Sequence, residues 1–210
     1  MKKTLSIITL LILAVSIVSA GSIYVDSGVS LSNGNRVYEV NSPSGLTGKT
    51  SPIPLSVVSL PIEIGYNYSS DNGIIASVSS SYFIVLSEKM DGEAVEEEYK
   101  FPNSIVAKTQ VGYGLKVNKK MNVELLGGIS FALGTRNDDE GNKASLTTLS
   151  IVAEAGINYE LDDSLYLRAG GKVGFPLKTN VKYKDAEDYK ITYSGFVFNF
   201  TLFAGVSYEF

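Results

Sequence analysis

The sequence predicts an all-β fold, an eight-stranded antiparallel up-and-down transmembrane β-barrel with meander topology. Three observations predict it. Apolar residues recur at every second position through eight segments of the chain, which is the period of a two-faced strand. The polar connections between these segments alternate between long and short. No stretch supplies the roughly 18 to 20 apolar residues that a membrane-spanning helix needs, so strands would have to cross any membrane.

The eight predicted strands are defined by the phase of their apolar side chains, and the first is the weakest. They span residues 23–31, 58–68, 74–86, 105–117, 123–133, 149–159, 165–175 and 196–210. An even number of strands is what a closed antiparallel barrel from bacteria requires. No linker or repeat interrupts the pattern, so residues 21–210 are expected to form one domain.

The connections give a second, separate signal. Tight turns are predicted at residues 69–73, 118–120 and 161–164, and longer polar connections at residues 32–54, 88–103, 135–145 and 176–195. Four long loops on one side and three short turns on the other match a barrel whose two termini both lie on the short-turn side. That side would face the periplasm.

Aromatic residues of the apolar phase gather at both ends of the strands. Toward the short turns these are Tyr66, Tyr68, Tyr113, Tyr159, Tyr208 and Phe210, and toward the long loops they are Tyr82, Phe131, Phe175, Phe196 and Phe198. Two such girdles are typical of a barrel embedded in lipid. Alternation alone also fits a soluble barrel or sandwich with its apolar face inward, and this alternative stays open.

The last predicted strand carries a family resemblance. Every even position from Phe196 to Phe210 is apolar, and the chain ends on an aromatic residue. In this it resembles the bacterial outer-membrane β-barrels, the broad group of opacity-type proteins and the OmpA, OmpX and OmpW barrels. The resemblance covers the chain after residue 20 as a pattern, without a diagnostic internal motif. It implies that Tyr208 and Phe210 form the assembly signal that the barrel assembly machinery recognises.

The N-terminus predicts export. Lys2 and Lys3 precede an apolar run from Leu5 to Val18, and Ala20 ends a small-residue cleavage site, so residues 1–20 are interpreted as a signal peptide. Cleavage would remove two lysines and change the formal charge from −4 to −6. Together with the resemblance, this predicts a bacterial outer-membrane location after cleavage.

The opposite phase of the strands would face the lumen, and it carries charges of both signs. This predicted lumen cluster consists of Glu63, Lys108, Lys116, Glu124, Glu154, Arg168 and Lys172. Counting across the turns sets Glu154 opposite Lys172 and Lys116 opposite Glu124, although a shift of two residues would keep the faces aligned. The cluster either fills a narrow lumen with ion pairs or acts as a relay or gate for solute.

The composition argues against an enzyme and against a metal or cofactor site. The chain has no His and no Cys, so the usual hydrolase triads and the imidazole or thiolate metal ligands are missing. The carboxylates that could serve acid/base chemistry have expected cationic partners. We therefore expect no catalytic residues, no cofactor and no dedicated metal site.

The long loops are the remaining source of function. Residues 176–195 interleave lysines with tyrosines, and Lys182, Tyr183, Lys184 and Tyr189 are candidate contacts for a partner. Expected partners are outer-membrane lipid, lipopolysaccharide and a host or cell-surface ligand; no strongly basic patch indicates nucleic acid. The predicted function is a non-enzymatic surface or envelope-stabilising role, including adhesion. The alternative, implied by the OmpW resemblance, is a narrow channel for small or apolar solutes.

Overall fold

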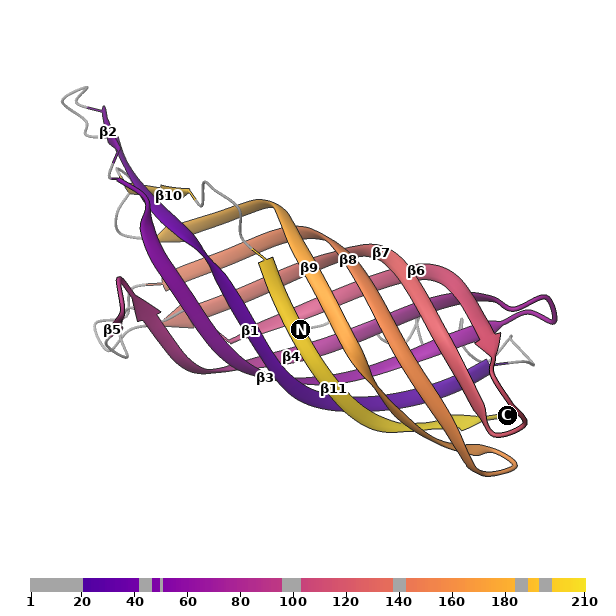
Figure 1. Cartoon of the computed structure of the whole chain (residues 1–210). Coiled ribbons are helices and arrows are strands. Elements are labelled where there is room, and N and C mark those ends of the chain that lie inside the picture. Colours follow the sequence, from indigo (N-terminus) through magenta and orange to yellow (C-terminus); the bar gives the residue numbers. More distant parts are fainter. Residues whose placement is uncertain are drawn as a thin grey trace.

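The computed structural model describes residues 21–41, 47–49, 51–95, 103–137, 143–183, 189–192 and 198–210. Their regular structure is entirely β, as Figure 1 shows. The strands are β1 (Gly21–Asn41), β2 (Thr47–Lys49), β3 (Ile53–Ser69), β4 (Ile74–Met90), β5 (Glu93–Ala94), β6 (Ser104–Lys116), β7 (Met121–Asn137), β8 (Lys143–Asp162), β9 (Leu165–Tyr183), β10 (Tyr189–Thr192) and β11 (Phe198–Glu209). Among the described residues, no helix is long and apolar enough to cross a membrane.

Eight of these strands close into a ring. The order is β1, β3, β4, β6, β7, β8, β9 and β11, and every neighbouring pair is antiparallel, with β11 returning to pair with β1. The short strands β2, β5 and β10 all lie at the end of the barrel that carries the long connections (Figure 1). The predicted eight-stranded antiparallel meander is therefore confirmed.

The first and last strands of the ring pair with each other and close the barrel. β1 pairs with β11 from Ser22↔Glu209 to Asn33↔Phe198. Beyond the start of β11, β10 takes its place, because it pairs with β1 on one side and with β9 on the other. Pairing with β10 thus extends the wall past the closing strand, although no pairing partner is described on this side for residues 34–36 of β1 or residues 175–179 of β9.

The long connections contain more strand than the sequence analysis predicted. Residues 32–54 include the second half of β1 and all of β2, and β1 continues to pair with β3 as far as Arg36↔Ile53. β4, β7, β8 and β9 likewise run beyond their predicted ends. The reason is that backbone pairing does not need an apolar face, so the ladder continues where the alternation stops. The three short turns lie where they were predicted.

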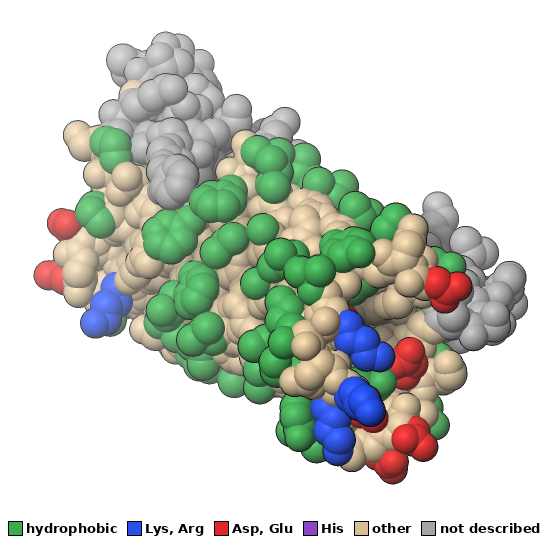
Figure 2. Space-filling model, turned by 45° about the vertical axis from the view of Figure 1, so that its right-hand side comes forward, with side chains coloured by type: hydrophobic (Ala, Val, Ile, Leu, Met, Phe, Trp, Pro, Cys, Tyr) green, Lys and Arg blue, Asp and Glu red, His purple; other side chains and the backbone are tan. Residues whose placement is uncertain are grey.

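The apolar phase faces outward. Exposed side chains on this face include Ile64 at 58%, Val111 at 65% and Leu202 at 58% of their full surface. Figure 2 shows the apolar side chains spread over the barrel wall, with charged side chains at its two ends. A soluble barrel or sandwich would bury this phase, so that alternative is wrong. The arrangement is apolar outside and polar inside.

The aromatic girdles are mostly where the sequence predicted them. Tyr68, Tyr113, Tyr159 and Tyr208 are exposed near the short turns, and Tyr82, Phe131, Phe175 and Phe198 are exposed toward the long connections. Phe196 lies outside the described residues. Tyr66 differs from the prediction because it is buried, with its ring over Gly21, where there is no Cβ to hold it away.

Candidate functional site

A layer of charged side chains crosses the middle of the barrel. We call it the septum, and it consists of Tyr24 and Asp26 on β1, Glu63 on β3, Lys108 on β6, Glu124 on β7, Glu154 on β8, and Arg168 and Lys172 on β9. These residues meet because each occupies the inward phase of its strand at a similar height. All of their side chains are buried, apart from a 13% exposed fraction at Lys172.

Glu63 is the anionic centre of one half of the septum. Its Oε1 lies 2.9 Å from Lys108 Nζ, and its Oε2 lies 3.0 Å from Lys172 Nζ. The hydroxyls of Tyr24 and Ser81 donate hydrogen bonds to the same carboxylate at 2.9 and 2.8 Å. Both oxygens therefore have a cation and a hydroxyl donor, as a carboxylate removed from bulk water requires.

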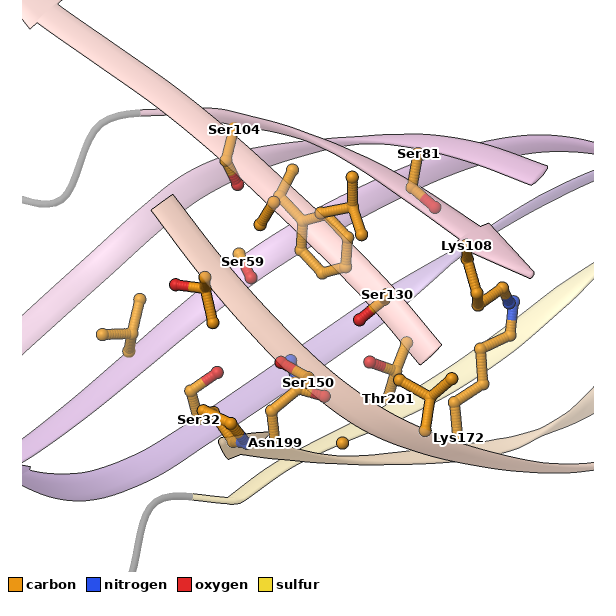
Figure 3. Close-up of a pocket in the computed structure, with 18 of the residues that line it drawn as sticks. Ser32, Ser59, Ser81, Ser104, Lys108, Ser130, Ser150, Lys172, Asn199 and Thr201 are labelled. Atoms are coloured by element: carbon orange, nitrogen blue, oxygen red, sulfur yellow. The ribbon is translucent and has the colours of Figure 1, made fainter. Parts of the chain in front are cut away.

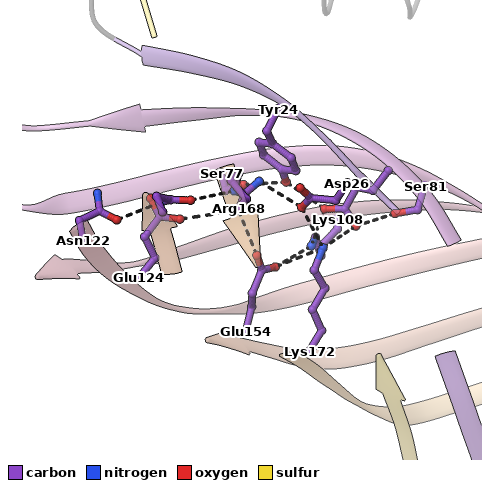
Figure 4. A network of polar contacts seen from close by, with 12 residues as sticks. Tyr24, Asp26, Ser77, Ser81, Lys108, Asn122, Glu124, Glu154, Arg168 and Lys172 are labelled. Carbon is purple, nitrogen blue, oxygen red and sulfur yellow. Dashed lines mark hydrogen bonds and ion pairs between the residues drawn. The ribbon is translucent and has the colours of Figure 1, made fainter. Parts of the chain in front are cut away.

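Arg168 is the cationic centre of the other half (Figure 4). Its guanidinium contacts Asp26 at 3.1 Å and Glu154 at 3.3 Å, and its Nε donates to Asn158 Oδ1 at 3.1 Å. The same group lies 3.9 Å from the centroid of the Tyr24 ring. A planar guanidinium suits this site because it can donate in several fixed directions while stacking on an aromatic face.

Glu154 joins the two halves. Its Oε2 lies 3.0 Å from Lys108 Nζ, while its Oε1 faces Arg168. These contacts connect β6, β8 and β9, and Arg168 continues them to β1. The ion pairs thus run across the lumen from wall to wall, and they tie together strands that are not neighbours in the ring.

The septum has one more carboxylate than cations. Asp26, Glu63, Glu124 and Glu154 face Lys108, Arg168 and Lys172, which gives a formal charge of −1. Glu124 is the least well paired, because its Oε2 lies 3.7 Å from Arg168. Among the described residues, this oxygen and Oδ1 of Asp26 have no hydrogen-bond partner.

The septum lies between two cavities. The loop-side cavity, toward the long connections, has a volume of about 220 Å³ and is lined by Glu63, Lys108 and Lys172 on its septum side. The turn-side cavity, toward the short turns, has a volume of about 260 Å³ and is lined by Glu124 and Asn158. Figure 3 shows Lys108 and Lys172 at one end of the loop-side cavity. Asp26, Glu154 and Arg168 line neither cavity and fill the space between them.

Three solved structures share this closed architecture at low sequence identity. Neisserial surface protein A is 14% identical, with 90% of this chain and 97% of that chain covered and a TM-score of 0.54. Outer membrane protein OprG from Pseudomonas aeruginosa is 12% identical over 91% and 97% of the two chains, with a TM-score of 0.58. Outer membrane protein AlkL, solved in lipid bilayers, is 18% identical over 90% of each chain, with a TM-score of 0.54. The fold is that of the small bacterial outer-membrane β-barrels. No protein-family model matches the chain, and neither does any curated protein sequence.

Within this fold, six of the seven predicted lumen charges lie together: Glu63, Lys108, Glu124, Glu154, Arg168 and Lys172. The predicted pairing of Lys116 with Glu124 is wrong. Lys116 lies at the short-turn end of the lumen, where it lines the turn-side cavity, and it is opposite Asn122, while Glu124 lies opposite Gly114. The register is shifted by two residues from the predicted one, a shift that leaves every side chain on its expected face.

Two members of the septum, both on β1, were not predicted from the sequence. Tyr24 and Asp26 lie in the weakest predicted strand, between apolar residues of the outward phase. The available signal was the alternation itself, which places Asp26 on the inward face of β1. A buried Asp at such a position needs a cation from another strand. The partner itself, Arg168, is 142 residues away in sequence and could not be found by counting across a turn.

The remaining predicted residues lie at the two ends of the barrel. Tyr208 and Phe210 are exposed at the short-turn end, with their ring centroids 5.8 Å apart. Lys182 and Tyr183 end β9 and Tyr189 begins β10, while Lys184 lies outside the described residues. In the part of the chain that the structure describes, no three acidic, His or Cys side chains are grouped to hold a metal ion.

Proposed function

We propose that the protein is a non-enzymatic outer-membrane β-barrel with a surface or envelope-stabilising role, and that its lumen is closed to ions. The observation that carries this proposal is the septum, whose buried ion pairs join opposite walls of the barrel. A network of this kind ties the strands together and leaves only side chains at the middle of the lumen. The function would then depend on the exposed surface of the barrel and its long connections.

The proposed location is supported by the outward apolar wall and by the shared fold. Residues 1–20, which the structure does not describe, are proposed to be a signal peptide that is removed on export. The protein should fractionate with outer membranes and migrate differently on gels before and after boiling. Recovery as a soluble protein with no heat-dependent shift would contradict the proposal.

The closed lumen is tested by conductance. The purified protein in planar bilayers should give little or no stable current. Arg168→Ala removes the contacts to both Asp26 and Glu154 and should produce measurable openings, whereas Lys116→Ala, at the exposed short-turn end, should not. Large and reproducible channels in the unmodified protein would refute the proposal that the lumen is closed to ions.

The surface role is proposed to depend on the end of β9, the start of β10 and the connection between them. There, Lys182, Tyr183, Lys184 and Tyr189 combine charge with aromatic area, which suits contact with lipopolysaccharide or with a host or cell-surface ligand. Replacing Tyr183 and Tyr189 by Ser should reduce adhesion of whole cells without changing the heat-dependent gel shift. Unchanged adhesion would exclude this connection as the contact surface.

A narrow conduit for small or apolar solutes is the second candidate. It is favoured by the apolar side chains that line the loop-side cavity, among them Leu55, Val57 and Phe83. A conduit would carry solute past the septum. Liposomes containing the protein should then take up a small apolar solute faster than empty liposomes, whereas a closed barrel gives no difference.

A further inference from the structure

The lining of the loop-side cavity changes from charged to apolar along its length. Its floor is formed by the septum residues Glu63, Lys108 and Lys172. Toward the long connections, each of three adjacent strands then turns apolar on its inward face: Leu55 and Val57 on β3, Phe83 and Val85 on β4, and Val106 on β6. A lumen wall that only needed to hold water would not require these side chains. The cavity is therefore amphiphilic, with its polar end buried.

The floor of the cavity is formally cationic. Two lysines and one glutamate line it, which gives a charge of +1, whereas the poorly paired Glu124 lines the turn-side cavity. Lys172 is the most exposed of the three septum cations, and its Nζ lies 3.0 Å from Glu63 but 3.7 Å from both Asp26 and Glu154. An ammonium has three donors, and contacts at 3.7 Å are beyond hydrogen-bonding distance. The ammonium of Lys172 can therefore donate a further hydrogen bond to a ligand at the cavity floor.

A second polar group lines the same cavity. Gln110 is 3% exposed, and among the described residues its Oε1 has no hydrogen-bond partner. Because an amide oxygen only accepts hydrogen bonds, this group needs a donor and cannot hold an anionic head; the free donors that suit an anion are those of Lys172. Along β6, the part of the cavity between the floor residue Lys108 and Ser104 covers about 13 Å of strand.

The geometry points to a binding site for a single-chain amphiphile with an anionic head, a medium-chain fatty-acid carboxylate, in the loop-side cavity. The carboxylate would accept charge-assisted hydrogen bonds from Lys172, and the alkyl chain would lie along the apolar wall. The volume of about 220 Å³ is below the roughly 300 Å³ at which pockets for drug-sized ligands begin, so one short chain fits better than a multi-chain lipid. The site is a dead end, since the septum forms its floor.

Octanoate is the probe. Binding of carboxyl-labelled octanoate to the full barrel in nanodiscs of zwitterionic lipid is measured by NMR titration, with octanol and octyltrimethylammonium as matched ligands. Octanoate should bind more tightly than octanol, and the cationic amphiphile should not bind. Lys172→Met should weaken octanoate about tenfold to 100-fold, as expected for one charge-assisted hydrogen bond, and leave octanol nearly unchanged. Lys116→Met, which lies in the turn-side cavity and not in the loop-side cavity, should leave both unchanged.

A second variant keeps the proposal testable if Lys172→Met does not fold. Val106→Trp should fill the loop-side cavity while leaving every septum residue unchanged in sequence, and it should abolish saturable binding of octanoate and octanol alike. Binding that persists in Val106→Trp, equal affinity for the cationic and anionic amphiphiles, or indifference to Lys172→Met would each overturn the inference. Conductance is a separate measurement, so an open lumen would refute the proposal that the lumen is closed to ions without deciding whether octanoate binds.

Discussion

Glu154 and Lys172 lie directly opposite each other on β8 and β9, yet they are not each other's main partners. The Glu154 carboxylate is 3.0 Å from Lys108 and 3.3 Å from Arg168, but 3.7 Å from Lys172, which lies 3.0 Å from Glu63. In a narrow barrel the far wall is as close as the neighbouring strand. Ion pairs therefore form across the lumen as well as between residues paired on neighbouring strands.

Replacing Glu154 by Gln should strongly destabilise the barrel. The substitution leaves Lys108 and Arg168 each without one of their anionic partners in a buried site. Removing one member of a buried ion pair costs about 3 to 5 kcal/mol, so we expect a loss of at least about 3 kcal/mol in the free energy of unfolding. Urea unfolding in lipid vesicles measures this. Glu93→Gln, on exposed β5, is the matched control and should change stability by less than about 0.5 kcal/mol.

Glu124→Gln should behave in the opposite way. Glu124 supplies the surplus negative charge of the septum, and its Oε2 lies 3.7 Å from the nearest cation. Gln retains most of the shape while removing that charge, so the unfolding free energy should stay within about 0.5 kcal/mol or increase. The same urea experiment compares the two variants. A loss as large as that of Glu154→Gln would show that Arg168 depends equally on both carboxylates.

The outward face allows a test of membrane depth. Ile129, in the middle of β7, and Val117, beside a short turn, are both 54% exposed. Arginine at the middle of a lipid-facing strand costs about 2 to 4 kcal/mol, and near the interface about 0 to 1 kcal/mol. Ile129→Arg should therefore lower the unfolding free energy in vesicles far more than Val117→Arg. Equal effects would indicate that neither side chain meets the hydrocarbon.

Deletion of Phe210 separates assembly from stability. Its backbone N–H donates to the Gly21 carbonyl at 3.1 Å, and its side chain is 61% exposed, so its contribution to stability is at most about 1.5 to 3 kcal/mol. If the residue acts mainly as an assembly signal, its deletion should sharply lower outer-membrane abundance in cells while barely affecting refolding into detergent. Equal failure in both measurements would assign Phe210 to stability, and normal abundance would refute a recognition role.

The sequence alone determined the strands and their faces. The period of two assigned residues such as Glu63 and Arg168 inward and Ile64 and Leu167 outward, and the short turns fixed the meander. The predicted Glu154↔Lys172 register is confirmed, although the alternation of the two strands also allowed a shift of two residues. These features are local, since alternation and turn length depend on neighbouring residues.

The tertiary structure decided the partners and the strand ends. The pairing of Asp26 with Arg168, and of Lys108 with Glu63, depends on the curvature and stagger of the closed ring, which no single strand encodes. The Lys116 register was missed because a two-residue shift preserves both faces. The strands continue into the long connections because hydrogen bonding between backbones persists where apolar alternation has stopped.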